Sequence, residues 1–224
     1  MVLAFVLAAA VCVAVAAQNR ASFTLADVVK QLDEQAKTFR SLTASMERTK
    51  VTVVVNDRST ENGLIFVRRD SKMLLEMVQP DARTILLNGN DLYIYTPRIK
   101  RVEEFDLGRH RTLVDQFLLL GFGTSGKDLE KGYLMTVLGE QSLSSKRVIQ
   151  LELTPKTEEV RNQISRIHLW IDMATWLPIQ QKFFETGSGD YFEIRYTNIV
   201  RNPNLPDSRF RPNWPRGVER IKRR

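Results

Sequence analysis

Cysteine and histidine are scarce in this sequence. Its 224 residues include one cysteine, Cys12, and two histidines, His110 and His168. A lone cysteine forms no disulfide within the chain, and zinc sites are usually built from several cysteines and histidines. No carboxylate cluster stands at ligand spacing from either histidine. The sequence therefore predicts no disulfide scaffold, no metal site and no cofactor.

The sequence also lacks a convergent set of catalytic groups. Glu103 and Glu104 are neighbours on a predicted strand, so they point to opposite faces, and we expect them on a solvated edge. Proton transfer needs groups that converge on one atom. The segment GFGTSGK at 121–127 has the glycine and lysine spacing of a phosphate-binding loop, but it follows a predicted helix, and Asp128 stands where that loop needs Ser or Thr. We interpret it as a hinge or helix stop, and we predict that the protein is not an enzyme.

Charge is absent from the first residues of the chain. The run VLAFVLAAAVCVAVAA at 2–17 is apolar, of signal-peptide length, and short for a membrane span. We expect a signal peptide over 1–17, with export to the periplasm, and a single domain over 18–224. The alternative is an N-terminal anchor that holds the domain at a membrane, facing the periplasm.

Positive charge exceeds negative charge, but it is not concentrated in one region. The net charge is +7, from 33 basic and 26 acidic residues, and basic residues cluster only in the last few positions. An exported chain seldom meets nucleic acid, so we expect no nucleic-acid partner. A basic surface that meets anionic lipid or an acidic protein fits the composition better.

The hydrophobic pattern changes from helical to extended near Thr43. Before it, apolar residues from Leu25 to Phe39 recur at helical spacing behind a capping Thr24. After it, alternation and turn residues predict about eleven antiparallel strands, a number that must curl and that encloses space unless something fills it. The predicted strands cover residues 44–55, 63–69, 72–79, 83–88, 91–96, 99–106, 133–140, 146–154, 164–173, 178–186 and 190–199.

A short helix is predicted to interrupt the sheet. Residues 112–120, TLVDQFLLL, have a broad apolar face, and glycines follow directly. The sequence thus predicts a mainly β protein of the α+β class, in which helices lie against a curled sheet.

The order of several short motifs resembles that of the periplasmic outer-membrane lipoprotein carriers, the LolA family. IFVRRDSKMLLEM at 65–77 and NGNDLYIYTP at 88–97 match a strand that ends in a basic pair, a second strand and a hairpin. LELTP at 151–155, RIHLWIDMATWLP at 166–178 and FRPNWPRGVERI at 210–221 follow in the family's order. The resemblance covers most of the chain after the predicted signal peptide.

The resemblance implies a fold and a function. The fold is an incomplete antiparallel β-barrel of about eleven strands, with a helical lid over an apolar cavity. The function is non-enzymatic: such proteins shield the acyl chains of a lipoprotein as it crosses the periplasm from inner to outer membrane. The implied partners are an ATP-driven extractor in the inner membrane and a receptor at the outer membrane, and we expect the carrier to be a monomer.

The resemblance also implies a latch on the lid, made by the second residue of the basic pair, which is Arg69. If Ile65 and Val67 face the cavity, alternation places Arg69 on the same face and leaves Arg68 in water. A charge-assisted hydrogen bond from Arg69 would contribute roughly 1.5–3 kcal/mol, enough to hold a lid that cargo can displace.

The expected lining of the cavity is apolar and includes two adaptable methionines. We expect it to be formed by Val53, Ile65, Val67, Met73, Leu75, Met77, Leu92 and Ile94, with Leu113, Phe117 and Leu120 from the lid. The same residues would equally form a packed core. Two alternative functions use the same fold: a carrier of another lipid, and an envelope sensor or regulatory module that binds lipid.

Overall fold

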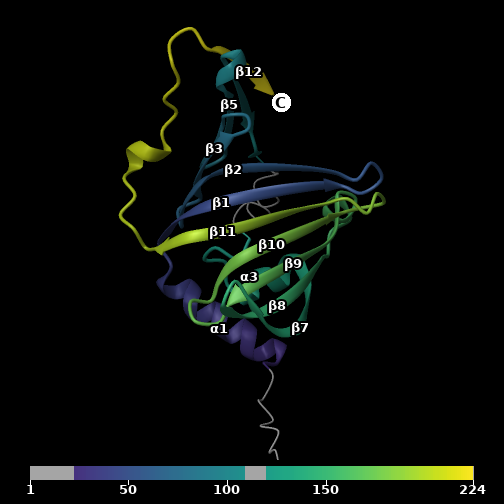
Figure 1. Cartoon of the computed structure of the whole chain (residues 1–224). Helices are drawn as coiled ribbons and strands as arrows, with labels where there is room; N and C mark the ends of the chain where they lie inside the picture. The colour runs from purple at the N-terminus through teal and green to yellow at the C-terminus, as the bar shows by residue number, and fades with distance from the viewer. Residues whose placement is uncertain (1–22, 109–119, 224) are drawn as a thin grey trace, which may run out of the picture.

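The computed structural model describes residues 23–108 and 120–223 and contains one curled sheet of twelve strands with helices against part of it (Figure 1). The expected signal peptide and most of the expected helix at 112–120 lie outside the described residues. Across the sheet the order is β12-β6-β5-β4-β3-β2-β1-β11-β10-β9-β8-β7, and the order does not close on itself. The mainly β, open-barrel prediction is confirmed.

The strands are β1 (Ser41–Thr52), β2 (Asp57–Arg68), β3 (Lys72–Gln79), β4 (Arg83–Asn88), β5 (Asp91–Thr96), β6 (Arg101–Asp106), β7 (Tyr133–Leu143), β8 (Lys146–Pro155), β9 (Ile164–Asp172), β10 (Leu177–Glu185), β11 (Tyr191–Arg201) and β12 (Glu219–Arg223). The helices are α1 (Leu25–Thr38), α3 (Gly126–Gly132) and α4 (Glu158–Arg161), with short 3-10 turns η1 (Pro97–Ile99) and η3 (Asp207–Phe210). All strand pairs are antiparallel except β12 with β6, which is parallel.

Two strand predictions need correction. The first strand ends at Thr52 rather than 55, so Val53 lies in the turn between β1 and β2. β2 begins at Asp57, six residues before its predicted start at 63, because polar pairs hold its first half to β1. Thr49 Oγ1 lies 3.0 Å from Thr60 Oγ1, and an Arg48 guanidinium nitrogen lies 3.0 Å from a Glu61 carboxylate oxygen. Such cross-strand pairs stabilise a sheet without an apolar pattern.

The twelfth strand, β12, was not predicted, and it changes the setting of β6. Arg220 pairs with Glu104, and an Arg223 guanidinium nitrogen lies 2.6 Å from a Glu103 carboxylate oxygen. The two glutamates therefore lie on an inner strand, held by ion pairs to β12, and not on a solvated edge as expected. Only Ile221 among the β12 residues is apolar, so periodicity gave no signal.

Helix α1 begins with a complete capping box. The Thr24 hydroxyl accepts a hydrogen bond from the Asp27 amide, and the Asp27 carboxylate accepts one from the Thr24 amide, which satisfies backbone groups at the helix start. Val28 and Leu32 on its buried face pack in a core cluster with β8 and β9. α1 and α3 therefore cover the β7–β9 side of the inner face of the sheet (Figure 1).

The inner face carries two core clusters. The first lies beneath α1 and α3 and contains Leu129, Leu151, Leu153, Ile167, Leu169 and Phe183, among others. The second lies on β1–β4 and contains Leu42, Met46, Ile65, Val67, Met73 and Leu87, together with Phe39 and Phe122. The apolar residues of β1–β4 and β8–β10 thus form the interior of one curved sheet.

The chain between β11 and β12 crosses the outer face of the sheet, and we call residues 203–215 the strap. Phe210 of the strap is fully buried against Leu74 and Leu86, on the face opposite the inner clusters. Arg68 fastens the strap: its guanidinium donates to the Leu205 carbonyl at 2.9 Å, forms a bidentate pair with Asp70 and pairs with Asp207. Arg68 is therefore not left in water, as the sequence predicted, because the strap covers the outer face at this point.

We expect acid to release the strap. Hydrogen bonds from Arg68 hold the pKa of Asp70 well below its usual range, and Arg68 and Lys72 also lower the pKa of Asp207. Both pKa values are lower in the folded chain than in the unfolded chain, where an Asp has a pKa of about 3.9. The two ionised carboxylates therefore stabilise the folded strap fully above that pH, and this stabilisation is lost progressively as the pH falls below it. Limited proteolysis of the strap should therefore accelerate below about pH 4.

Arg68→Ala at neutral pH is the matched comparison for this prediction. It removes the cation from the same network, so it should reproduce the acid result while the inner core keeps the rest of the domain folded. Near-UV circular dichroism would monitor that core. Equal strap protection at pH 7 and pH 2.5 would show that the ion pairs do not fasten it.

Candidate functional site: an apolar inner face with a buried polar link

The pairing register brings most of the predicted lining residues together. Ile65, Leu75 and Ile94 lie in one cross-strand row, with Ile85 between the last two. The next row is Val67, Met73, Leu87, Leu92 and Phe105. Alternation places both rows on the inner face, and Met77 joins them two residues beyond Leu75. The result is a continuous apolar surface over β2–β5, which Phe105 extends onto β6 and which Glu103, opposite Ile94, ends.

Burial decreases along this surface toward β6. Ile65, Val67 and Met73 are buried, whereas Leu75, Leu92 and Ile94 are only half-buried. The helices that cover β7–β9 do not contribute to the β1–β4 cluster among the described residues. The inner face of β3–β5 therefore presents apolar side chains that the described residues cover only in part.

The other predicted lining residues have different places. Val53 is 50% exposed at the β1–β2 turn, next to exposed Val54 and Val55, and does not point into the interior. Leu120 is buried in the cluster beneath α1. Leu113 and Phe117 lie outside the described residues.

A buried polar link crosses the interior and was not predicted. The Gln181 amide nitrogen donates to the Leu120 carbonyl at 2.6 Å, and the Gln181 amide oxygen accepts from the Tyr196 hydroxyl at 3.0 Å. All three groups are buried, and burial raises the pKa of the Tyr196 hydroxyl far above its usual value. The link joins β10 and β11 to the chain segment that enters the glycine-rich loop. The sequence signal for this link is the position of Gln181, two residues before Phe183 on β10. Alternation gives the two side chains the same inward direction.

The glycine-rich loop passes close to α1. Gly123 has φ +72°, and a Cβ on it would lie 2.2 Å from Cδ1 of Phe39. A Cβ on Gly126 would lie 2.7 Å from the Val29 backbone. Ser125 then caps α3 through the Asp128 amide, at 3.1 Å. These glycines permit close packing and the start of a helix, which accounts for the spacing that resembles a phosphate-binding loop.

Arg69, the predicted latch, lies past the end of β2 with an exposed side chain. One guanidinium nitrogen lies 3.4 Å from the Lys37 carbonyl in the last turn of α1. Its backbone amide donates to the Arg40 carbonyl at 2.9 Å. The residue therefore contacts the C-terminal end of α1, where a cation interacts favourably with the helix dipole.

A polar rim ends the apolar surface on the side of the β1–β2 turn. Arg48 and Arg83 both pair with Glu61, at 3.0 and 3.2 Å. The Arg48 guanidinium also lies 4.8 Å from the centre of the Phe192 ring. Among the described residues, no group of three or more His, Cys, Asp or Glu is placed to hold a metal ion.

His168 lies on the outer face of β9, as alternation predicted. Its Nε2 is 2.9 Å from a Glu152 carboxylate oxygen, and its Nδ1 is 3.2 Å from the Gln150 amide nitrogen. Both ring nitrogens thus have structural partners. His110 lies outside the described residues.

The curled open sheet, the helices on one side and the apolar inner face define a LolA-like half-barrel protein. A family model described as "-like: Uncharacterized protein" matches residues 69–199, and the chain belongs to that family. Within the described residues, no helix has the length and apolar character needed to cross a membrane.

Two curated relatives and one solved structure are similar to this chain. An outer-membrane lipoprotein carrier protein of Dechloromonas aromatica is 24% identical over 194 residues, which cover 87% of each chain. One of Cupriavidus pinatubonensis is 24% identical over 163 residues, covering 73% of this chain and 71% of the relative. An uncharacterized conserved protein of Thermus thermophilus has a similar crystal structure, with a TM-score of 0.59 and 10% identity over 89% of this chain and all of that one.

Proposed function

We propose that the protein is a non-enzymatic periplasmic carrier that shields the acyl chains of a lipoprotein in an apolar cavity between the inner and outer membranes. The observation that supports this most directly is the apolar inner face of β3–β5, where Leu75, Leu92 and Ile94 are only half-buried. Two relatives named outer-membrane lipoprotein carrier protein are each 24% identical to this chain over most of their length.

Transfer energetics explain why such a protein needs an apolar interior. Each methylene exposed to water costs about 0.8 kcal/mol, so a chain of roughly sixteen carbons costs on the order of 12 kcal/mol. A polar surface cannot offset a free energy of that size, whereas an apolar sheet face can. The methionines at 73 and 77 also adapt to acyl chains of different shape.

In this proposal the interior opens by a local movement and not by unfolding. Arg69 is the proposed latch, since it reaches the end of α1, and the Gln181 link is a second fastening within the interior. The exposed 3.4 Å contact of Arg69 and each hydrogen bond of Gln181 contribute about 1 kcal/mol or less, which an incoming acyl chain exceeds at about 0.8 kcal/mol per buried methylene. The proposed lining is the inner-face set Ile65, Val67, Met73, Leu75, Met77, Leu92 and Ile94, with Leu120 and the lid residues Leu113 and Phe117.

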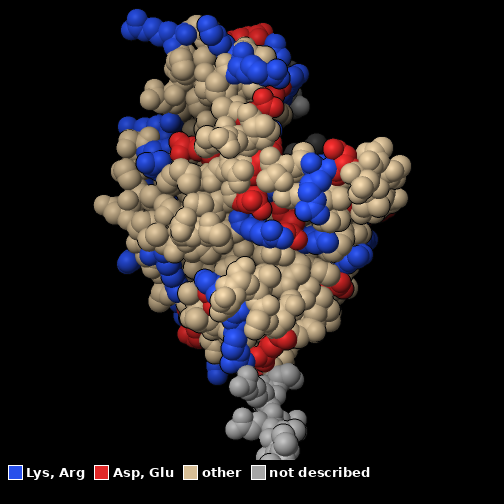
Figure 2. Space-filling view, viewed as in Figure 1, with Lys and Arg blue, Asp and Glu red and all other residues tan. Residues whose placement is uncertain are grey.

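The proposed partners act at each membrane. An ATP-driven extractor in the inner membrane would deliver the lipoprotein, and an outer-membrane receptor would accept it. The face shown in Figure 2 has Lys and Arg interspersed with Asp and Glu. On that face we therefore expect partner contacts of mixed charge.

Native mass spectrometry tests the carrier function. The chain would be produced with residues 1–17 in a Gram-negative host, released from the periplasm without detergent and sprayed intact. We expect a fraction of the protein to carry an added mass that fragments into an acylated peptide or a free lipid. A lipid without a peptide would favour the alternative of a carrier for another lipid. A protein that stays unliganded and binds no fatty acid added in vitro would contradict the proposal.

A further inference from the structure

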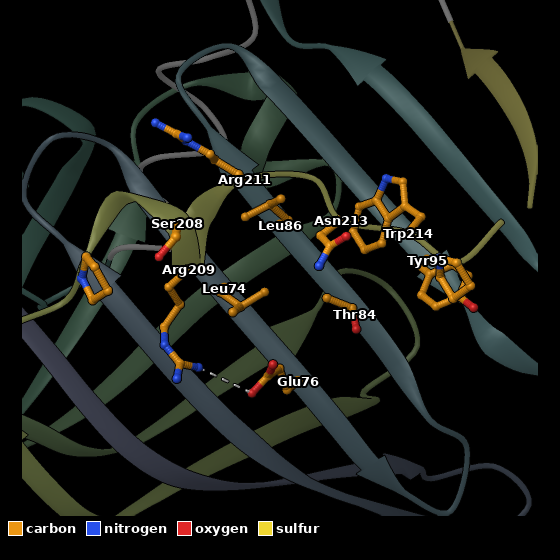
Figure 3. Close-up of a pocket in the computed structure, with 12 residues that line it drawn as sticks. Leu74, Glu76, Thr84, Leu86, Tyr95, Ser208, Arg209, Arg211, Asn213 and Trp214 are labelled. Carbon is orange, nitrogen blue, oxygen red and sulfur yellow. Dashed lines mark ion pairs between the residues drawn. The ribbon is translucent and has the colours of Figure 1, made fainter.

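A hollow lies on the other side of the sheet from the apolar inner face, between the outer face and the strap (Figure 3). It has a volume of about 520 Å³, within the range of roughly 300–1,000 Å³ that small-molecule sites occupy. Its floor comes from β3, β4 and β5, and its walls come from residues 206–215 of the strap. The whole sheet thickness separates it from the inner face, so the proposed carrier function makes no use of it.

One end of the hollow is aromatic. The rings of Tyr95 and Trp214 lie 5.2 Å apart between centroids, and Tyr93 contacts the same indole at 6.2 Å. The indole Nε1 of Trp214 is buried and has no acceptor in the described part of the chain. The buried leucines Leu74 and Leu86 form the apolar floor beside these rings.

Polar side chains with unused hydrogen-bonding capacity line the rest of the hollow. Thr84 lies on the floor, and Ser208, Arg211 and Asn213 project from the strap. None of these four side chains forms a hydrogen bond or ion pair within residues 23–108 and 120–223. Figure 3 shows Asn213 between Leu86 and Thr84, with the aromatic pair to one side and the two arginines to the other.

The two arginines of the hollow differ in their surroundings. Arg209 is held in place: its guanidinium lies 4.2 Å from the centre of the Phe66 ring and 3.9 Å from a Glu76 carboxylate oxygen. Arg211 has no acidic partner among the described residues. Because Glu76 balances Arg209, the charged lining has one uncompensated cation, which favours a ligand that bears a negative charge.

We propose that this hollow binds a short acidic saccharide. A sugar ring has an apolar face, which fits Trp214 and Tyr95, and a hydroxylated edge, which fits Thr84 and Asn213. A carboxylate on a neighbouring ring would pair with Arg211, whose planar guanidinium binds carboxylates by two parallel hydrogen bonds. The aromatic rings, and an amide, hydroxyls and a guanidinium without bonded partners among the described residues, correspond to the parts of such a ligand.

A proline-rich peptide is the competing occupant of an aromatic groove. Peptide grooves of that kind are lined mainly by aromatic and apolar side chains, whereas polar side chains are as prominent as rings in this hollow. In addition, Pro206 and Pro215 of the strap already form part of its wall. The saccharide accounts for more of the lining, and the peptide is retained as an outcome of the test.

Calorimetric titration of the chain with trigalacturonate, maltotriose and decaproline distinguishes these ligands. We expect saturable binding of trigalacturonate, at least tenfold tighter than that of the uncharged maltotriose, and no binding of decaproline. Arg211→Ala should weaken trigalacturonate binding about tenfold, to the level of maltotriose, because only the charged contact is lost. Trp214→Ala should abolish binding of both sugars.

Control variants distinguish the loss of ligand contacts in the hollow from a general disturbance of the fold or strap. Arg98→Ala removes a cation whose side chain is 80% exposed and lies outside the hollow, and Trp170→Ala removes an indole from β9. Both should bind trigalacturonate as the unaltered chain does. Arg211→Ala should keep the unaltered melting temperature, since that side chain has no bonded partner among the described residues. No saturable heat with trigalacturonate, or saturable binding of decaproline alone, would overturn the proposal.

Discussion

Replacing Gln181 with leucine is expected to lower the melting temperature by roughly 5–15 °C. The leucine fits the apolar surroundings, but it leaves the Leu120 carbonyl and the Tyr196 hydroxyl buried without their partner. Each buried polar group left without a hydrogen-bond partner lowers the free energy of unfolding by about 1–3 kcal/mol. A differential scanning calorimetry trace of the variant against the unaltered chain measures the shift, and hydrogen exchange near residue 120 should rise with it.

Two further variants show whether the loss arises at this link. Tyr196→Phe removes the hydroxyl but leaves the bond from Gln181 to Leu120, so its loss should be near 1 kcal/mol. Gln141→Leu makes the same change at an exposed glutamine, whose amide nitrogen donates to Gln150 at 3.0 Å, and should have little effect. If Gln181→Leu has the melting temperature of the unaltered chain, water reaches the interior at this point and the link does not stabilise the fold.

Replacing Ile94 with glutamate is expected to weaken acyl-chain binding at least a hundredfold, which corresponds to about 3 kcal/mol. Ile94 lies on the proposed lining and is half-buried, so a carboxylate there remains tolerable in the empty protein but loses water when an acyl chain covers it. The measurement is a titration with a dansyl-labelled fatty acid, whose emission rises on transfer from water to an apolar site.

Leu64→Glu provides the matched control for this variant. Leu64 is 41% exposed, and alternation from Ile65 places it on the outer face, so the same charge is added to the other side of the sheet. We expect unaltered affinity for the dansyl probe. Equal affinities in both variants would mean that the acyl chain does not lie against β5.

The sequence predicted those parts of the fold in which burial follows a simple period. β3, β4, β5, β8 and β9 alternate apolar and polar residues or follow clear turn residues, so their positions agree with the structure to within a few residues. The first half of β2 and all of β12 are held by polar pairs and ions, such as Arg48 with Glu61 and Arg220 with Glu104. Hydropathy contains no information about such pairs, and the pair that holds β12 also joins residues 116 positions apart in sequence.

The candidate site was predicted in a similar way. Seven of the expected lining residues lie on one inner surface because alternation continues across β2, β3 and β5. Val53 was misplaced because an apolar residue next to a strand end looks like a strand residue. Arg68 was assigned to water because nothing local indicates that residues 205–210 cover it. The Gln181 link required the fold, since its partners are 15 and 61 residues away.

The position of β1 beside β11 affects when the sheet can assemble. Leu42 pairs with Arg201, so the strand made first and the strand made nearly last are neighbours at the middle of the sheet. Among the described strands, β2–β6 lie on one side of this pair and β7–β10 on the other. Pairings this distant along the chain form slowly, after most of the polypeptide is available. The sheet of a nascent chain with this topology is therefore completed only late in synthesis.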